Sequence, residues 1–154
     1  MGTRFTIAAL GLALALLSSG LSSRLHAAPG GTDRPIEGSG EGQVTGVSPE
    51  GALIAESAGT ATHLGKFTRT ESVFVDGFAI SGTIVFTAAN GDELRATFAG
   101  AFTSPTTAEG RYTFVGGTGR FEGATGAADF EATTETTPDG VTHLAVSFEG
   151  QISY

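Results

Sequence analysis

Polar and apolar residues alternate along most of the chain after residue 36, which is the pattern of half-buried β-strands. The alternation is clearest over residues 80–88 and 94–102, where apolar or small side chains take every second position and Ser, Thr, Glu and Arg occur mainly between them. Asn90-Gly91 lies between these segments and is the typical pair of a two-residue hairpin turn. We therefore predict an antiparallel hairpin over residues 80–102.

Weaker alternation predicts further strands on both sides of this hairpin. The segment 59–75 is rich in Thr and Val and lacks helical spacing, so it is either one bent strand or two successive strands. The remaining expected strands cover residues 36–44, 52–57, 111–115, 127–134 and 143–154. About eight strands without a credible helix after residue 28 predict an all-β antiparallel sheet.

The first and last strands have matching alternation and matching small residues, over 36–40 and 148–152. If they pair, the sheet closes into a barrel and leaves no exposed edge. The apolar side of the strands would then face the lumen, which a barrel of eight strands either fills or keeps open for one small ligand. This lumen set is Ile80, Ile84, Phe86, Leu94, Phe98, Phe102, Tyr112, Phe114, Phe130, Leu144, Val146 and Phe148.

A dense run of glycines occupies residues 116–126 and resembles a dinucleotide-binding loop at first sight. Such a loop needs a helix directly after it to hold the pyrophosphate. The following residues, 127–134, alternate like a strand, so we interpret the run as an ordered corner of the barrel. The expected corner residues are Gly116, Gly117, Gly119, Arg120, Phe121 and Gly123.

The N-terminus has the features of a secretory signal peptide. Arg4 precedes an apolar run over residues 5–17, and Ala27-Ala28 stands before Pro29. We expect a signal peptide at 1–28, a flexible lead-in at 29–35 and one barrel domain at 36–154. The mature protein would be secreted or periplasmic and free of the membrane; an uncleaved anchor is the alternative.

Charge and cysteine content narrow the functional classes. The net charge is −8, and cleavage after Ala28 would make it more negative by removing Arg4 and Arg24. Nucleic acids and anionic membranes both require a basic surface, so neither is an expected partner. Without cysteine the chain has no disulfide or thiolate chemistry. No spacing of ligand residues indicates a metal, and we expect no cofactor.

Candidate ligand residues come from the lumen set. They are His63, Phe86, Phe98, Tyr112, Phe114 and Phe148, with His63 included because it shares a strand side with Phe67 if that strand is unbroken. A lone histidine is more often a hydrogen-bonded structural residue than a catalyst. The charged residues Glu93, Arg95, Asp129, Glu131 and Glu149 fall on the solvent side, so hardly any lumen residue is expected to titrate. A solidly packed core is the alternative to a ligand cavity.

Three segments carry a resemblance to a known family. They are Ala61-Thr62-His63-Leu64-Gly65, Phe86-Thr87-Ala88-Ala89-Asn90-Gly91-Asp92, and the glycine run with Gly116-Gly117-Thr118-Gly119-Arg120-Phe121 and Gly123-Ala124-Thr125-Gly126. Over residues 36–154 the chain resembles the bacterial secreted members of the allene oxide cyclase and dirigent-like barrel superfamily. The resemblance implies an eight-stranded barrel with an axial apolar pocket, a trimer as in the plant members, and no cofactor.

Two functions follow as expectations. The first is a secreted, non-catalytic barrel that binds a small apolar molecule or serves a structural role. The second is a cofactor-free cyclase or isomerase, or a stereo-directing protein, of the family's type. A carboxylate or histidine that points inward beside an open cavity would favour the second function.

Overall fold

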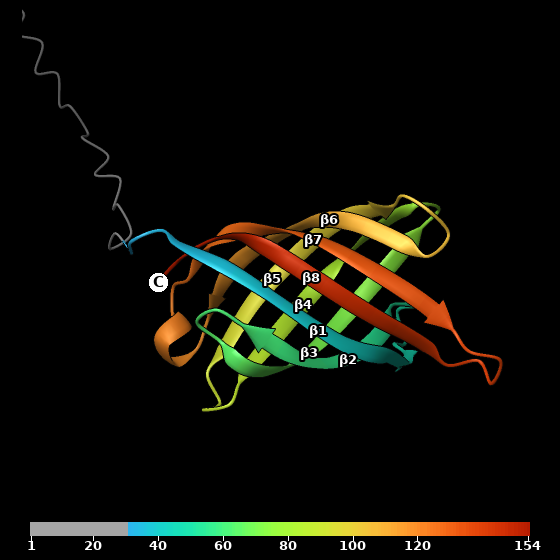
Figure 1. Ribbon diagram of the computed structural model, residues 1–154, viewed down its shortest axis with the longest axis horizontal. Coiled ribbons are helices and arrows are strands. Elements are labelled where there is room, and N and C mark those ends of the chain that lie inside the picture. The colour runs from blue at the N-terminus through green and yellow to red at the C-terminus, as the bar shows by residue number, and fades with distance from the viewer. Residues whose placement is uncertain (1–30) are drawn as a thin grey trace, which may run out of the picture.

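The structure is a computed structural model that describes residues 31–154, and these residues form a closed antiparallel barrel (Figure 1). The strands pair in chain order, and the last pairs with the first, as predicted. Their bounds are β1 Arg34–Val47, β2 Leu53–Ala61, β3 Gly65–Asp76, β4 Ala79–Ala88, β5 Glu93–Phe102, β6 Thr107–Gly117, β7 Thr125–Thr136 and β8 Thr142–Ser153. One turn of 3-10 helix, η1 Gly119–Phe121, lies between β6 and β7.

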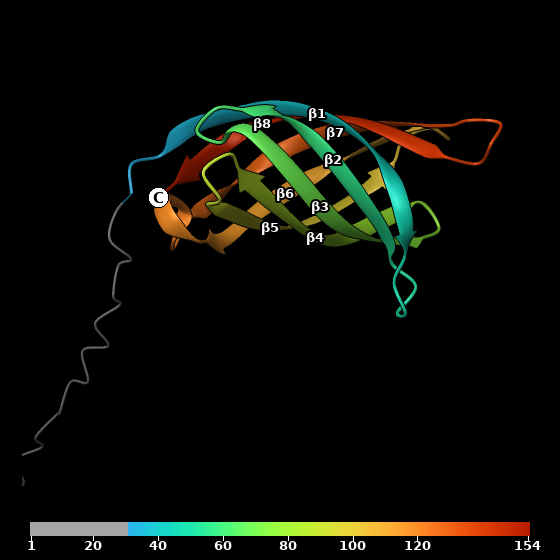
Figure 2. The same ribbon diagram turned by 90° about the horizontal axis from the view of Figure 1, so that it is seen from below.

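Closure depends on the ladder between β1 and β8. Ile36 pairs with Gly150, Gly38 with Phe148 and Gln43 with His143, so the ladder runs along most of both strands. In Figure 2, β1 arches over the barrel beside β8 and β2. The barrel has no free sheet edge among the described residues, and the hazard of an open edge is therefore removed.

The lumen is packed with the apolar side chains that the alternation assigned to it. Phe86, Leu94, Tyr112, Phe114 and Phe148 are all at most 4% exposed, whereas Phe102 is only partly buried. Burial of each such side chain contributes roughly 1.5–3 kcal/mol to folding. The alternation therefore identifies most of the core of β4 to β8, whereas the core also contains Ile36 of β1, Ala55 of β2 and Phe67 of β3.

Glycines on the inward side let aromatic rings lie flat against the sheet. Gly82 pairs with Phe98 across β4 and β5, and Gly110 pairs with Phe130 across β6 and β7. A Cβ atom at Gly110 would lie 2.7 Å from ring atoms of Phe130, so only glycine leaves room for that ring. Cross-strand contacts of this kind help a strongly coiled sheet to keep its register.

The segment 59–75 is two strands and not one bent strand. β2 continues to Ala61, a turn covers residues 62–64, and β3 begins at Gly65. His63 has a φ of 68° and Gly65 a φ of 65°, so the chain reverses in the left-handed region that glycine favours. The expected lead-in also ends earlier than the alternation indicated, because β1 begins at Arg34.

The glycine corner is ordered around one carboxylate. Asp92, from the β4–β5 turn, accepts a 3.4 Å hydrogen bond from the backbone nitrogen of Arg120, and its Oδ2 lies 3.6 Å from Arg120 Nε. Phe121 is fully buried and packs edge to face on Tyr154. The corner therefore closes one end of the barrel with a buried aromatic residue.

The expected signal peptide, 1–28, lies outside the described residues and stays a prediction. No helix in the range 31–154 is long and apolar enough to cross a membrane.

Candidate ligand pocket

A cavity of about 170 Å³ lies inside the barrel, toward the end that carries the β1–β2, β3–β4, β5–β6 and β7–β8 turns. All eight strands contribute to its wall. The lining is Val44, Leu53, Ala55, Arg69, Glu71, Val73, Val75, Ile80, Phe98, Phe102, Ala108, Tyr112, Phe130, Ala132, Thr134, Thr142, Leu144 and Val146. The lumen is therefore open at this end and packed at the other.

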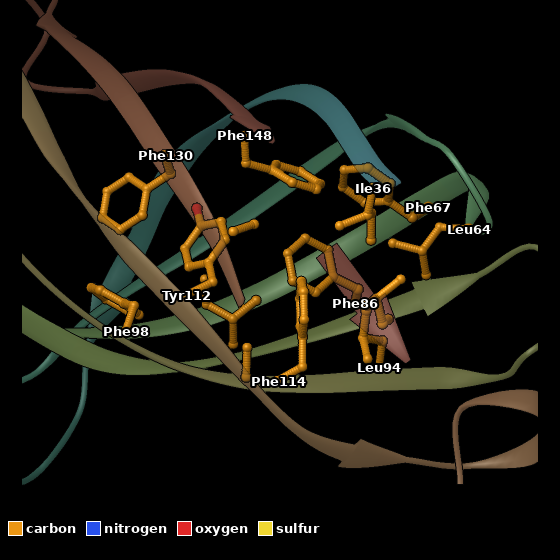
Figure 3. Packing of buried hydrophobic residues seen from close by; sticks show 14 of the residues in the cluster. Ile36, Leu64, Phe67, Phe86, Leu94, Phe98, Tyr112, Phe114, Phe130 and Phe148 are labelled. Carbon is orange, nitrogen blue, oxygen red and sulfur yellow. The ribbon is translucent and has the colours of Figure 1, made fainter. Parts of the chain in front are cut away.

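Tyr112 lines the cavity and also contacts Phe86 of the packed part of the lumen. Its ring stacks on Phe130, with centroids 4.5 Å apart, and meets Phe86 edge to face at 6.1 Å. Figure 3 shows Phe98 and Phe130 on one side of Tyr112, and Phe86 and Leu94 on the other. The aromatic contacts fix the tyrosine and make it the floor of the cavity.

A buried ion pair lies at the same floor. Arg69 and Glu71, both on β3, are 2% and 8% exposed, and Arg69 Nη2 donates to Glu71 Oε1 at 3.0 Å. Arg69 Nη1 donates to the Tyr112 hydroxyl at 3.3 Å. The guanidinium carbon also lies 5.9 Å from the Phe86 ring centre. Arg69 therefore links the floor of the cavity to the packed core.

Burial dominates the electrostatics of this cluster. It raises the pKa of Glu71 above the usual glutamate range, although the Arg69 charge and hydrogen bond act in the opposite direction. The neighbours of Glu71 across the sheet, Ala55 and Ile84, are buried and apolar, which explains the loss of solvation. Burial also raises the pKa of Tyr112, so this residue stays a neutral phenol.

One polar atom of the cluster lacks a partner. Arg69 Nε is the only buried side-chain nitrogen or oxygen within residues 31–154 that makes no hydrogen bond. Glu71 Oε2 also makes no hydrogen bond to a described residue, but it is not sealed by the surrounding atoms. A ligand in the cavity therefore has one accessible carboxylate oxygen to meet.

The structure distributes the predicted ligand residues over three places. Phe98 and Tyr112 line the cavity. Phe86, Phe114 and Phe148 are buried in the packed cluster and are not part of the lining. His63 lies in the β2–β3 turn at the opposite end, where its Nε2 is 3.0 Å from the Pro35 carbonyl oxygen. The positive φ of His63 takes it off the strand side of Phe67, so the lumen position expected for it is wrong.

The expected lumen set omits a charged pair, because Arg69 and Glu71 also point inward. The sequence contains a pattern that predicts their inward position. Every second position of β3 is taken by Phe67, Arg69, Glu71 and Val73. Once Phe67 is placed inside, the period of two places the charged pair inside as well. A search for alternating apolar residues alone does not find Arg69 and Glu71, because both are charged.

A larger hollow of about 840 Å³ lies on the outer face, chiefly over β1, β2, β7 and β8. Its wall carries Glu37, Glu131 and Glu149, and it is open to solvent. Small-molecule sites are enclosed and mostly apolar, so the smaller lumen cavity is the better candidate. No group of three His, Cys, Asp or Glu within residues 31–154 is arranged to hold a metal ion.

Comparisons with known proteins place the fold. The chain is similar to the solved structure of the pterocarpan synthase dirigent protein PsPTS1, with 14% identity, a TM-score of 0.51, and coverage of 80% of this chain and 96% of that chain. It is also similar to the pterocarpan synthase dirigent protein GePTS1, with 14% identity, a TM-score of 0.44, and coverage of 79% and 86%. No family model and no curated protein sequence matches the chain. The likeness to PsPTS1 therefore shows that the chain has a dirigent-like β-barrel fold.

Proposed function

We propose that the barrel binds one small apolar molecule with a single oxygen or nitrogen function and holds it in one orientation, as a stereo-directing protein of the dirigent type must. The observation that carries this proposal is the buried Arg69–Glu71–Tyr112 cluster at the floor of an otherwise apolar cavity. Apolar walls bind the body of a ligand, and a few fixed polar groups set its orientation.

The size of the cavity limits the ligand. An apolar cavity of about 150 Å³ is large enough for benzene. A cavity of about 170 Å³ therefore suits a molecule with one ring, or one ring of a longer molecule that extends through the open end. Rings of Phe98 and Phe130 stand at 86° to each other and present both a face and an edge to such a ligand.

The cluster is rigid enough to orient a ligand. Arg69 is held by Glu71, by Tyr112 and by the face of Phe86, so neither charged side chain can turn freely. A buried ion pair contributes little net stability, and well-packed apolar residues in its place are often as stable. Its position beside a cavity is therefore better explained by a role toward a ligand.

A second function, cofactor-free isomerisation, is favoured by one observation. Glu71 points into the cavity and its pKa is raised, which are properties of a general acid or base that gives one proton to a substrate and removes another. This feature matches the inward carboxylate that distinguishes the catalytic alternative. Both functions use the same pocket. They differ in whether the bound molecule is only oriented or is also converted into an isomer.

The pocket is tested with phenol, 4-methylphenol, acetophenone and benzene by thermal unfolding and calorimetry. We expect the three oxygen-bearing compounds to raise the melting temperature by binding the folded state, and benzene to do so less. Ala132→Phe on β7 points into the cavity and should abolish the response.

Ala145→Phe on β8 is the matched control, because Ala145 is exposed on the outer face and its substitution should leave the response intact. Absence of any response in the parent protein, or an equal response in Ala132→Phe, would refute the pocket. Turnover of a bound compound, followed by mass and chirality of the products, would separate isomerisation from orientation.

A further inference from the structure

Glu71 offers its two carboxylate oxygens to different partners. Oε1 accepts the hydrogen bond from Arg69, whereas Oε2 makes no hydrogen bond to a described residue and is not sealed by its neighbours, and Glu71 lines the cavity. When Glu71 takes up a proton, Oε1 keeps the Arg69 hydrogen bond, so the proton must be carried by Oε2. The group that meets the ligand is thus a bare acceptor in one state and an O–H donor in the other.

No other group in the pocket can change in this way. Arg69 is always charged, and Tyr112 stays a phenol because burial raises its pKa. The facing strands β7 and β8 contribute Thr134 and Thr142, which carry no charge, and the remaining lining from β1, β2, β4 and β5 is apolar. The neighbouring His143 and Glu135 are exposed on the outer face. Within residues 31–154, Glu71 is therefore the one titrating group at the cavity whose protonation can alter ligand contacts.

We propose that Glu71 sets the hydrogen-bond polarity of the pocket, so that its ionised form selects ligands with an N–H or O–H donor and its protonated form selects ligands with a carbonyl or ether oxygen. This inference rests on the proposed ligand-binding function of the same cavity. It deepens that function by assigning a ligand class to each protonation state. The apolar wall, with Phe98, Phe130 and Leu144, is common to both classes.

The charges at the floor of the cavity support this change of ligand preference. Arg69 and the ionised Glu71 are together neutral, which suits a neutral donor ligand. Desolvation raises the pKa of Glu71 and so favours the protonated form. An acceptor ligand binds only the protonated form well, and its binding must therefore raise the pKa of Glu71 further. A donor ligand must lower that pKa by the same linkage.

The test compares two neutral probes of similar size that do not titrate near neutral pH. Indole has one N–H donor and no comparable acceptor, whereas acetophenone has one carbonyl acceptor and no donor. Calorimetry at about pH 5 and about pH 8 compares two solutions, and Glu71 carries its proton to a greater extent in the first. Indole should bind more weakly at the lower pH and acetophenone more tightly, each by about tenfold for a hydrogen bond to a charged or strongly polar group.

Glu71→Gln provides the matched variant, because its amide has both a donor and an acceptor at every pH. In this variant both probes should bind with affinities that no longer depend on pH. Glu131→Gln removes an exposed carboxyl on β7 and is the control for loss of one negative charge. Its affinities should follow the parent protein at both pH values.

A measurement on the parent protein alone keeps the test decisive if Glu71→Gln fails to fold. The carboxyl ¹³C resonance of Glu71 should titrate with the same midpoint as the affinities, with indole lowering that midpoint and acetophenone raising it. Binding of both probes without pH dependence, or with a dependence unchanged in Glu71→Gln, would overturn the inference and leave the proposed function standing. Failure of both probes to bind at either pH would count against the proposed function itself.

Discussion

At the scale of single residues, the candidate site depends on two charged side chains that alternation of apolar residues does not reveal. Arg69 and Glu71 continue the inward series of Phe67 and Val73, but their charge excludes them from the expected lumen set. His63 belongs to the lumen only if the strand continues through it, and a turn with positive φ removes it. Residue periodicity thus predicts the side of a strand well, provided that the strand bounds are known.

The pH dependence of stability follows from Glu71. Its folded pKa is raised, so the folded protein holds the proton more tightly than the unfolded chain does. Stability relative to Glu71→Gln should therefore fall as pH rises from the usual glutamate range through the folded pKa, and stay level above it. A tenfold difference in proton affinity between the folded and unfolded states corresponds to about 1.4 kcal/mol of stability.

Denaturant unfolding of both proteins between about pH 4 and 8 measures this difference. Glu131→Gln again controls for removal of a carboxyl. A relative stability of the parent protein that increases with pH would mean that Arg69 outweighs burial at Glu71.

At the scale of elements, the hairpin of β4 and β5 and the run of eight strands follow from alternation and turn chemistry. The sequence does not reveal where β2 ends, because Thr and Gly continue through the turn. It also does not reveal η1, since a single 3-10 turn has no periodicity to detect. The interpretation of the glycine run as an ordered corner agrees with the contacts of Asp92 with Arg120.

The corner makes a prediction about its glycines. Gly119 and Gly123 both have positive φ, so Gly→Ala at either position should cost about 1–2 kcal/mol. A Cβ at Gly119 would also collide with the Asp92 carboxylate, whereas a Cβ at Gly123 meets no atom within 4 Å. Gly119→Ala should therefore lower the free energy of unfolding more than Gly123→Ala.

Arg120→Ala removes a partly exposed ion pair with Asp92 and the contact of the guanidinium with the Phe121 ring, and should cost about 1 kcal/mol. Chemical denaturation of the three variants gives this order directly. Equal losses for the two glycine variants would show that Asp92 moves aside at no cost.

At the scale of the whole molecule, closure by β1 and β8 is predictable because both strands carry the same alternation and small inward residues. The cavity is not predictable, since it depends on how far the aromatic rings fill a lumen that eight strands leave narrow. The trimer implied by the family resemblance stays a prediction. What the fold provides is a rigid wall around a small, partly polar space.

Closure can be tested by shortening the chain. A protein that begins at Asp33 keeps the whole β1–β8 ladder and should melt cooperatively at the temperature of the mature protein. One that begins at Gly42 loses most of that ladder, exposes two sheet edges and should aggregate or melt without cooperativity. Cooperative melting of the shorter protein would show that β1 is dispensable.

We propose that the lumen cavity is a ligand site with Glu71 as its polar contact. A crystal structure of the protein with 4-bromophenol, with the bromine located by its anomalous signal, tests it most directly. We expect bromine between Phe98, Phe130 and Leu144, and the phenol oxygen within hydrogen-bond distance of Glu71 Oε2. Bromine found only on the outer face, or an empty lumen at saturating 4-bromophenol, would contradict the claim.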